Sequence, residues 1–203
     1  MSELRVALTF DAEHPDRPWC PPGNADRILD ALRDAGARAT FFVQGRWAKS
    51  DPAAARRIAD EGHLVGHHSH YHARMPLLSD EGLRADMLDA QQAIGETTGV
   101  DPRPWFRCPF GAGHDDQRVL STLAELGYRN VHWHVELEDW EPYRDGPAIA
   151  RDAVDGIVAH GSGAVVLLHT WPGGTGTAVP ILLKELRGRE AAFVGIDELE
   201  ELP

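Results

Sequence analysis

Short apolar runs alternate along this chain with stretches in which apolar residues recur every three or four positions. Seven runs are rich in apolar and β-branched residues, and each predicts a strand. These runs cover residues 4–10, 38–43, 63–66, 104–107, 130–135, 164–169 and 191–195. Between them, apolar residues at i, i+3, i+4 and i+7 predict helices. We expect helices to begin after an Asn24 cap, at Pro52, after Ser79, near Val119, near Ala150 and near Pro180.

Strands that alternate with helices imply a parallel sheet, because parallel neighbours must be joined by crossover connections. An open doubly wound sheet and a barrel of β/α units both fit this pattern. The first strand is not followed by GxGxxG, which argues against the dinucleotide-binding form of the open sheet. The Pro- and Gly-rich residues 15–23 predict a loop, and no linker, repeat or low-complexity stretch divides the chain. We therefore expect one α/β domain over residues 1–203.

Composition and charge exclude several classes of protein. Of the 203 residues, 42% are hydrophobic, which is enough for one domain with a substantial core. The 20 basic and 32 acidic residues give a net charge of −12, which argues against nucleic-acid or anionic-membrane binding. No apolar run reaches the roughly 18 residues of a membrane span. The first residues lack the features of a secretion signal, so we expect a cytoplasmic protein unless a leader has been removed.

Polar clusters follow the ends of five predicted strands. They are Asp11 with Glu13, residues 67–72, Arg107, residues 136–140 and His169. Active sites of β/α barrels and sheets are built where the strands end at their carboxyl sides. The five clusters therefore predict one functional site to which all five segments contribute.

Histidines are concentrated after the third predicted strand. Four of the 11 histidines stand in the run HHSHYH at residues 67–72. Imidazole is a good ligand for zinc and neighbouring transition metals. The sequence contains neither HExxH nor CxxC, and a closed structural zinc site would favour thiolates. We therefore expect an open catalytic metal site with two histidines and one carboxylate, from Asp11 or Glu13, which face the same side of an extended segment.

Five short motifs occur in a fixed order between the first and sixth predicted strands. They are TFDAE at residues 9–13, HSHYH at 68–72, RCPFG at 107–111, ELEDW at 136–140 and LLH at 167–169. This series resembles the polysaccharide deacetylases, also described as the NodB homology domain or carbohydrate esterase family 4. The resemblance implies a distorted (β/α)7 barrel over the whole chain. It also implies a metal-dependent hydrolase that removes acetyl groups from N- or O-acetylated carbohydrates.

The resemblance implies a catalytic role for four residues. Asp11 matches the general base, and Arg107 matches the arginine that holds it. His169 matches the general acid, and Asp139 matches the acid that tunes it. Together these residues imply that water attacks the acetyl carbonyl while one side chain accepts a proton and another donates one.

Five further positions match substrate and metal contacts of the family. The backbone N–H of Phe110 would contact the oxyanion, while Trp140 and Leu167 would form the wall around the acetyl methyl group. His68 and His72 match two metal ligands. The bound ion is expected to be a single divalent metal, zinc by preference, with cobalt or nickel as alternatives.

One position departs from the family pattern. The family usually shows TFDDG, and its second aspartate is a metal ligand, but this chain has Ala12 there. Some relatives use a D-x-[DE] arrangement, so we expect Glu13 to be the third ligand. Glu136 also replaces the usual first aspartate of its motif, which is a conservative change.

Two other functions remain open at this stage. The chain could be a metal-dependent amidase or cyclic-amide hydrolase that acts on a small non-sugar substrate. It could also be a metal-free carbohydrate-binding relative whose metal site decayed at Ala12. The expected partner is an acetylated saccharide or a small amide. Trp19, Trp47, Trp105 and Trp171 are expected to pack in the core or in loops, with stacking of Trp171 on a sugar face as an alternative. Cys108 is expected to be a buried thiol.

Overall fold

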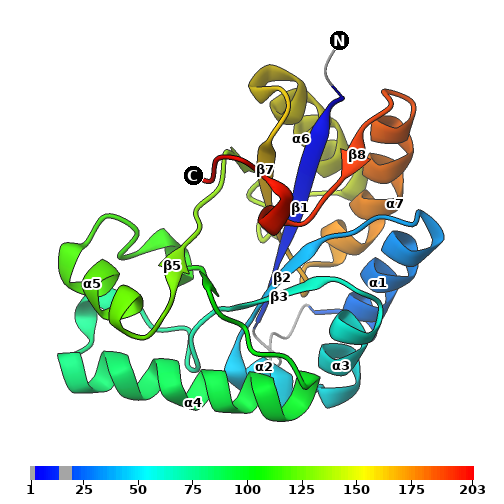
Figure 1. Cartoon of the computed structure of the whole chain (residues 1–203). Coiled ribbons are helices and arrows are strands. Elements are labelled where there is room, and N and C mark those ends of the chain that lie inside the picture. Colours follow the sequence, from blue (N-terminus) through cyan, green and yellow to red (C-terminus); the bar gives the residue numbers. More distant parts are fainter. Residues whose placement is uncertain (1–2, 14–19) are drawn as a thin grey trace.

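All strands of the described chain pair in parallel and form one curled sheet (Figure 1). The computed structural model describes residues 3–13 and 20–203. The strands are β1 (Arg5–Ala12), β2 (Thr40–Val43), β3 (Leu64–His67), β4 (Trp105–Phe106), β5 (Arg129–Asn130), β6 (Val135–Glu136), β7 (Ala164–His169) and β8 (Ala192–Phe193). They are arranged in the order β5-β4-β3-β2-β1-β7-β6, and β8 pairs with the beginning of β1.

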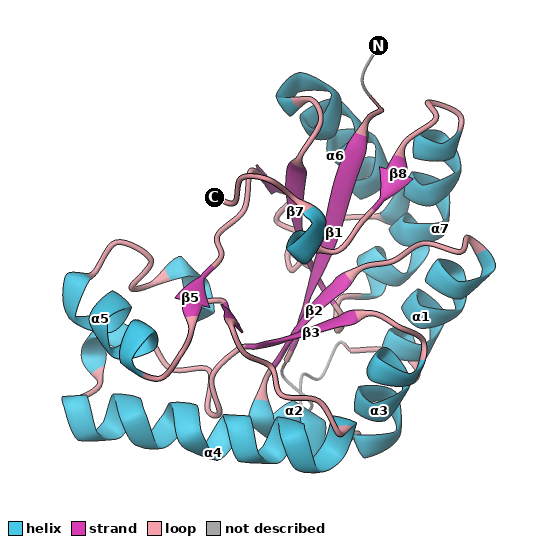
Figure 2. Ribbon diagram, viewed as in Figure 1, coloured by secondary structure: helices cyan, strands magenta, loops and turns pink. Residues whose placement is uncertain are grey.

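The predicted fold class, an α/β domain with a distorted barrel of seven β/α units, is confirmed. Seven parallel strands curl into a half-barrel, and Figure 2 shows the helices around the outside of these strands. β1 lies at the centre between β2 and β7, and its register places Asp11 beside His169. The curl brings the carboxyl ends of distant strands toward one another, which positions the site described below.

The predicted strand over residues 130–135 is wrong, because this segment forms two short strands at opposite edges of the sheet. β5 pairs with β4, whereas β6 pairs with β7. Between them, the N–H of Val131 donates to Phe106 and the N–H of His134 donates to Val165. The segment therefore crosses the gap between the two sheet edges. Its alternating apolar pattern is compatible with any extended chain and does not identify the pairing partner.

In the described residues, seven α-helices accompany these strands. They are α1 (Asn24–Asp34), α2 (Gly45–Ser50), α3 (Pro52–Asp60), α4 (Asp80–Thr98), α5 (Gln117–Glu125), α6 (Gly146–His160) and α7 (Gly173–Arg187). Two predicted starts are confirmed by their caps. Asp51 accepts a hydrogen bond from the N–H of Ala54, with Pro52 in the first turn, and Ser79 accepts one from the N–H of Gly82.

Two helix starts differ from the prediction. Gly23, with φ of 71°, precedes α1, and the Asn24 side chain instead donates to the carbonyls of Thr170 and Pro172 at 2.8 and 2.9 Å. α7 begins at Gly173 and not near Pro180, which lies inside the helix. Its glycines conceal this start because glycine is a poor helix former. A Cβ at Gly176 would lie only 2.1 Å from Oδ1 of Asn24, so the close packing of α7 on α1 requires glycine.

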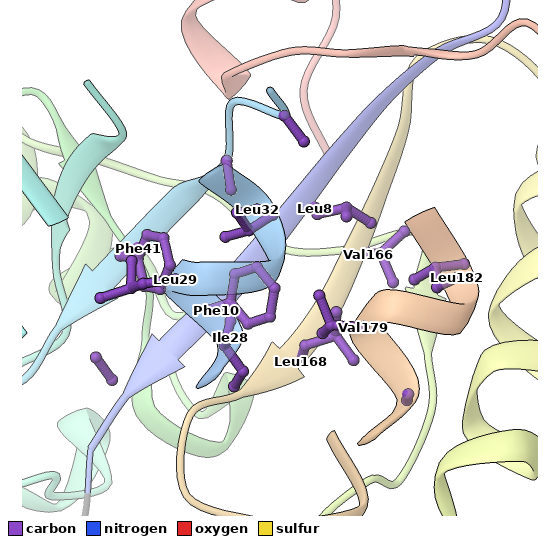
Figure 3. Packing of buried hydrophobic residues seen from close by; sticks show 14 of the residues in the cluster. Leu8, Phe10, Ile28, Leu29, Leu32, Phe41, Val166, Leu168, Val179 and Leu182 are labelled. Carbon is purple, nitrogen blue, oxygen red and sulfur yellow. The ribbon is translucent and has the colours of Figure 1, made fainter. Parts of the chain in front are cut away.

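The main hydrophobic core lies between the outer face of the sheet and the covering helices. Figure 3 shows Leu8 and Phe10 of β1 packed with Val166 and Leu168 of β7, against side chains of α1 and α7. The helices contribute Ile28, Leu29, Leu32, Val179 and Leu182. All of these side chains are fully buried, and burial of this kind is worth roughly 1.5–3 kcal/mol for each large aliphatic residue.

β1 separates core residues from site residues by strand alternation. Leu8, Phe10 and Ala12 belong to the main hydrophobic core, whereas Thr9 and Asp11 face the other side, toward Arg107. Ala12 is therefore a core residue and does not face the site. The loss of an acid at this position leaves the site intact if the following residue, Glu13, supplies the carboxylate.

Within the described residues, no helix is both long enough and apolar enough to cross a membrane. Cys20 and Cys108 are both free thiols.

Candidate active site

Side chains from five separate segments meet around a cavity of about 460 Å³ at the carboxyl edge of the sheet. The segments follow β1, β3, β4, β6 and β7, as the polar clusters predict. Residues lining the cavity are Asp11, Glu13, His72, Arg74, Phe110, Trp133, Glu136, Trp140, Glu141, Pro142, Leu167, His169 and Trp171. His68, Arg107 and Asp139 lie directly behind this surface and contact residues that line it.

Glu13, His68 and His72 form a buried cluster in which one ligand atom from each residue lies within 4.8 Å of the others. Nε2 of His68 lies 3.1 Å from Oε2 of Glu13, and Nε2 of His72 contacts the same oxygen. Nδ1 of His68 lies 2.9 Å from the carbonyl oxygen of Arg107. Since only a protonated Nδ1 can donate to a carbonyl, this contact fixes the ring so that Nε2 is the nitrogen that faces Glu13.

The charge balance of this cluster favours a bound cation. Burial alone would raise the pKa of Glu13, but hydrogen bonds from His68 and His72 hold it well below the usual value. Burial lowers the pKa of His72, whereas for His68 the nearby Asp11 and Glu13 outweigh burial and raise it. An ionised carboxylate between two imidazole nitrogens is stabilised by a positive charge at this position. Two nitrogens and one oxygen also match the donor set of an open zinc-type site.

The loop that carries the two histidines is held in an unusual backbone conformation. Ser69 and His72 have φ of 62° and 56°, and Oγ of Ser69 accepts a hydrogen bond from the N–H of His72. Asp86 of α4 accepts hydrogen bonds from the N–H groups of His70 and Tyr71 at 2.9 and 3.0 Å. Left-handed positions at non-glycine residues persist only where their surroundings hold them. Asp86 is therefore a support for the ligand loop, and it was not predicted from the sequence.

Asp11 is paired with the fully buried Arg107. Nη1 of Arg107 lies 3.0 Å from Oδ1 of Asp11 and 2.8 Å from Oγ1 of Thr9. Nε and Nη2 of Arg107 donate to the carbonyls of Val131 and His132. Burial lowers the pKa of Arg107, and the charge of Asp11 opposes this effect. The second oxygen of Asp11 lies 3.4 Å from Nε2 of His68 and so faces the Glu13–His68–His72 cluster.

His169 is held by Asp139 from the segment after β6. Nδ1 of His169 lies 2.7 Å from Oδ1 of Asp139, and the N–H of His169 donates to Oδ2 of the same residue. The hydroxyl of Thr175 also donates to Oδ2. Burial would lower the pKa of His169, but the charge and hydrogen bond of Asp139 raise it to about 9. His169 is therefore cationic at neutral pH, with its Nε2 3.8 Å from Oε1 of Glu13.

The three predicted substrate contacts also lie at the cavity. The Trp140 ring stands edge-on to His169 with ring centres 5.3 Å apart, and Leu167 is buried in the cavity wall. Phe110 has φ of 58°, and its side chain is 54% exposed. In the described part of the chain, the N–H of Phe110 has no hydrogen-bond partner, so it is available to a ligand.

Trp171 is buried, in agreement with the prediction of core or loop packing. Its side chain is 4% exposed, and its indole N–H donates to Oε1 of Glu13 at 3.1 Å. Little of its ring face is open for stacking on a sugar, and its clearest contact is with the carboxylate of the ligand cluster. Thr9 accepts a hydrogen bond from Arg107, and Thr175 donates one to Asp139; neither of these supporting residues is predicted from the sequence. A signal was present for Thr9, because it lies two residues before Asp11 on the same face of β1.

Cys108 lies in the RCPFG motif but not in the cavity. Its side chain is 1% exposed, and burial raises the pKa of its thiol to about 12. The prediction of a buried, unreactive thiol is therefore confirmed. His14 and Trp19, two other polar or aromatic residues of the first loop, lie outside the described residues.

The comparisons with known proteins agree with this geometry. A family model described as polysaccharide deacetylase matches residues 1–131. A peptidoglycan-N-acetylglucosamine deacetylase of Bacillus cereus is 33% identical over 210 residues, which cover 98% of this chain and 89% of the relative. A peptidoglycan-N-acetylmuramic acid deacetylase of Bacillus subtilis is 28% identical over 198 residues, which cover 97% of this chain and 72% of the relative.

A solved structure offers a contrasting comparison. The chain superimposes on a CE4 family pseudoenzyme from Bacillus anthracis with a TM-score of 0.83 and 26% sequence identity. The match covers 98% of this chain and 66% of the pseudoenzyme. Similarity of fold is therefore compatible with both active and inactive proteins, and the side chains of the site must distinguish them.

Proposed function

Because the chain belongs to the polysaccharide deacetylase family, we propose that it hydrolyses the acetamido group of an N-acetylated carbohydrate. One observation carries this proposal. Asp11, paired with Arg107, and His169, paired with Asp139, both approach the Glu13–His68–His72 cluster. A base and an acid in different electrostatic settings around one reacting centre are what hydrolysis of an amide needs.

Glu13, His68 and His72 would hold a divalent metal ion, with zinc as the first choice and cobalt or nickel as alternatives. Their donor set, their burial and the hydrogen bond from Nδ1 of His68 to a backbone carbonyl all fit such an ion. When bound, the ion supplies a Lewis acid for the acetyl carbonyl and for a water molecule. Glu13 would thus replace the second aspartate of the usual motif, at the position where this chain has Ala12.

Asp11 would accept the proton of the attacking water. Its Oδ1 is held by Arg107, which leaves Oδ2 directed at the cluster where the water would lie. Arg107 fixes the orientation of the carboxylate and neutralises its charge in the buried site. A positioned general base of this type contributes roughly 10²–10⁴ in rate.

His169 would donate a proton to the leaving amine. Asp139 holds Nδ1, so the proton to be transferred lies on Nε2, which faces the cavity. The available N–H of Phe110 would donate to the oxyanion that forms on the acetyl carbonyl, a contact worth about 3 kcal/mol in comparable enzymes. Trp140 and Leu167 would surround the acetyl methyl group with apolar surface.

The two alternatives are less well supported. A metal-free carbohydrate-binding relative would not need a paired base and a paired acid, yet both pairs are present with hydrogen-bonding distances. A small cyclic amide would fit the cavity, but the relatives described above are named as deacetylases of peptidoglycan sugars. The assay should nevertheless include cyclic ureides, because ring opening without acetate release would favour this alternative.

The test is release of acetate from chito-oligosaccharides, peptidoglycan fragments and acetylated xylan. The protein would first be stripped of metal and then supplied with zinc, cobalt or nickel. We expect metal-dependent acetate release that is lost in Asp11→Asn while bound metal is retained. Asp60→Asn, which neutralises an exposed acid at the end of α3, is the matched control. A metal-loaded protein that releases no acetate from any of these substrates would contradict the proposal.

A further inference from the structure

Arg74 lies at the cavity in a position that the mechanism above does not use. It follows the ligand His72 by two residues and lines the same cavity. Among the described residues around this cavity, Arg74 is the one lysine or arginine. Arg107 lies behind the surface and is already paired with Asp11, so its charge is not available to a ligand.

The Arg74 guanidinium is held in place by an aromatic ring. Its central carbon lies 4.3 Å from the centre of the Phe110 ring, and the same ring packs on His72 with ring centres 4.4 Å apart. Stacking of this kind restricts the orientation of the planar guanidinium. In the described part of the chain, Arg74 forms no ion pair and no side-chain hydrogen bond. Its N–H donors are therefore available to a ligand beside the reacting centre.

The other charges at the cavity are arranged differently. Glu136, at the end of β6, and Glu141 line it, and the rest of the site holds the acids Asp11 and Glu13. His169 is the other cationic group that lines the cavity, and its charge is paired with Asp139. An anionic group on a substrate would be repelled by the two glutamates and attracted to Arg74. A planar guanidinium with free donors forms two parallel hydrogen bonds with a carboxylate, so this is the anion it recognises best.

We propose that Arg74 binds a carboxylate carried by the same sugar ring that loses its acetyl group. This inference rests on the proposed deacetylase function and names its substrate class: N-acetylated amino sugars of the muramic acid type. In such a sugar, a lactyl ether on the carbon next to the acetamido carbon places a carboxylate a few bonds from the scissile amide. Arg74 packs on the ring of Phe110, so its guanidinium lies beside the residue whose N–H is proposed to contact the acetyl carbonyl.

The test compares two probes that differ at one group. The first is the disaccharide of N-acetylglucosamine and N-acetylmuramic acid, and the second is the same disaccharide with its lactyl carboxylate converted to a methyl amide. Loss of acetyl from the muramic ring is followed by mass spectrometry, and the readout is the ratio of kcat/KM for the acid to that for the amide. For the unmodified protein we expect a ratio of about ten, as for a charge-assisted hydrogen-bonded pair that is partly exposed.

Three variants of Arg74 and one control variant test whether this residue sets the ratio. Arg74→Ala should lower it to about one, and Arg74→Lys should leave a ratio of roughly two to three, because an ammonium cannot form the paired contact. Arg74→Glu should bring it below one. Arg189→Ala, which removes an exposed arginine after α7, should keep the unmodified ratio. Since Arg74 is exposed, these variants should fold, and a shift in thermal unfolding would reveal one that does not.

The outcomes separate two kinds of failure. A ratio near one in the unmodified protein would overturn the inference, and so would an Arg74→Ala variant that loses activity on both probes in equal measure. In either case, acetate release from the probes would leave the proposed function standing. If neither probe nor any chito-oligosaccharide releases acetate, the proposed function fails and the role of Arg74 fails with it.

Discussion

Neutralising Asp139 should change the pH dependence of the protein in a defined direction. Burial lowers the pKa of His169, but Asp139, together with the charges of Glu13 and Asp11, raises it from 6.5 to about 9. At roughly 1.4 kcal/mol for each pKa unit, this rise corresponds to about 3 kcal/mol of preference for the cationic imidazole. Asp139→Asn keeps a hydrogen-bonding side chain of the same shape but removes the charge. The largest of the raising effects would then be lost, and the pKa of His169 should fall toward 6.5.

The consequence for activity is a shift of the alkaline limb of kcat/KM. In the unmodified protein His169 loses its proton near pH 9, whereas in Asp139→Asn it loses its proton near pH 6.5. At pH 8 the protonated fraction of His169, and with it kcat/KM, should fall about thirtyfold. The assay is acetate release measured from pH 5 to pH 10. Glu138→Gln is the matched control, because it removes a neighbouring exposed charge that does not contact His169. An alkaline limb that does not move in Asp139→Asn would refute the assignment of Asp139.

The Asp139–His169 pair should also make the free energy of unfolding depend on pH. The folded-state pKa of His169 is higher than its ordinary value, so its contribution to stability is fully present below about pH 6.5 and is lost as the pH rises through about 9. The difference in unfolding free energy between the unmodified protein and Asp139→Asn should therefore be about 3 kcal/mol at pH 6 and much smaller at pH 10. Urea unfolding of the metal-free proteins measures this difference. A difference that is equal at both pH values would contradict the linkage.

Four further changes test the support around the site. Glu13→Gln should weaken zinc binding by at least about a hundredfold, as measured by competition with a chelator, and unchanged affinity would exclude Glu13 as a ligand. Trp171→Phe removes the indole donor to Glu13 and should weaken zinc binding by roughly tenfold while the fold is kept. Asp86→Ala removes two hydrogen bonds to the ligand loop and should lower the unfolding free energy by about 1–3 kcal/mol, measured by urea titration. Thr175→Val should lower kcat with little change in zinc affinity, and Thr175→Ser should restore it; a loss of metal instead would indicate a general disturbance of the site.

That the site residues come together at one edge of the sheet could be predicted from the sequence, because each of them lies at the end of a predicted strand. Asp11 and His169 each follow an apolar run, and parallel strands in one sheet bring such ends to one edge. Their register partners in the structure are each other. The resemblance to the family indicates that Glu13, and not the residue at position 12, is the third metal ligand. Strand alternation gives a physical reason for this assignment, because Ala12 faces the core.

Contacts that depend on distant packing could not be predicted in this way. Asp86 supports the ligand loop because α4 packs against the loop after β3. No local sequence pattern predicts this packing. A signal was nevertheless present, because an acid stands among the apolar residues Leu83, Met87 and Ala90 on one face of the helix. The start of α7 could not be predicted because its glycines do not favour a helix, and Gly176 is required by the close approach of Asn24, a residue far away in the sequence.

The burial of Arg107 has a consequence for how the protein loses activity. Its guanidinium is completely enclosed, and its partners come from β1 and from the segment that crosses between the sheet edges. If that segment opened, the carbonyls of Val131 and His132 would no longer accept hydrogen bonds from Arg107. A buried guanidinium that lacks these partners would cost free energy. Opening of the crossing segment and release of Asp11 should thus be a single event. Because this opening is costly, the segment should stay closed until the whole domain unfolds, so inactivation on heating should coincide with the change in circular dichroism.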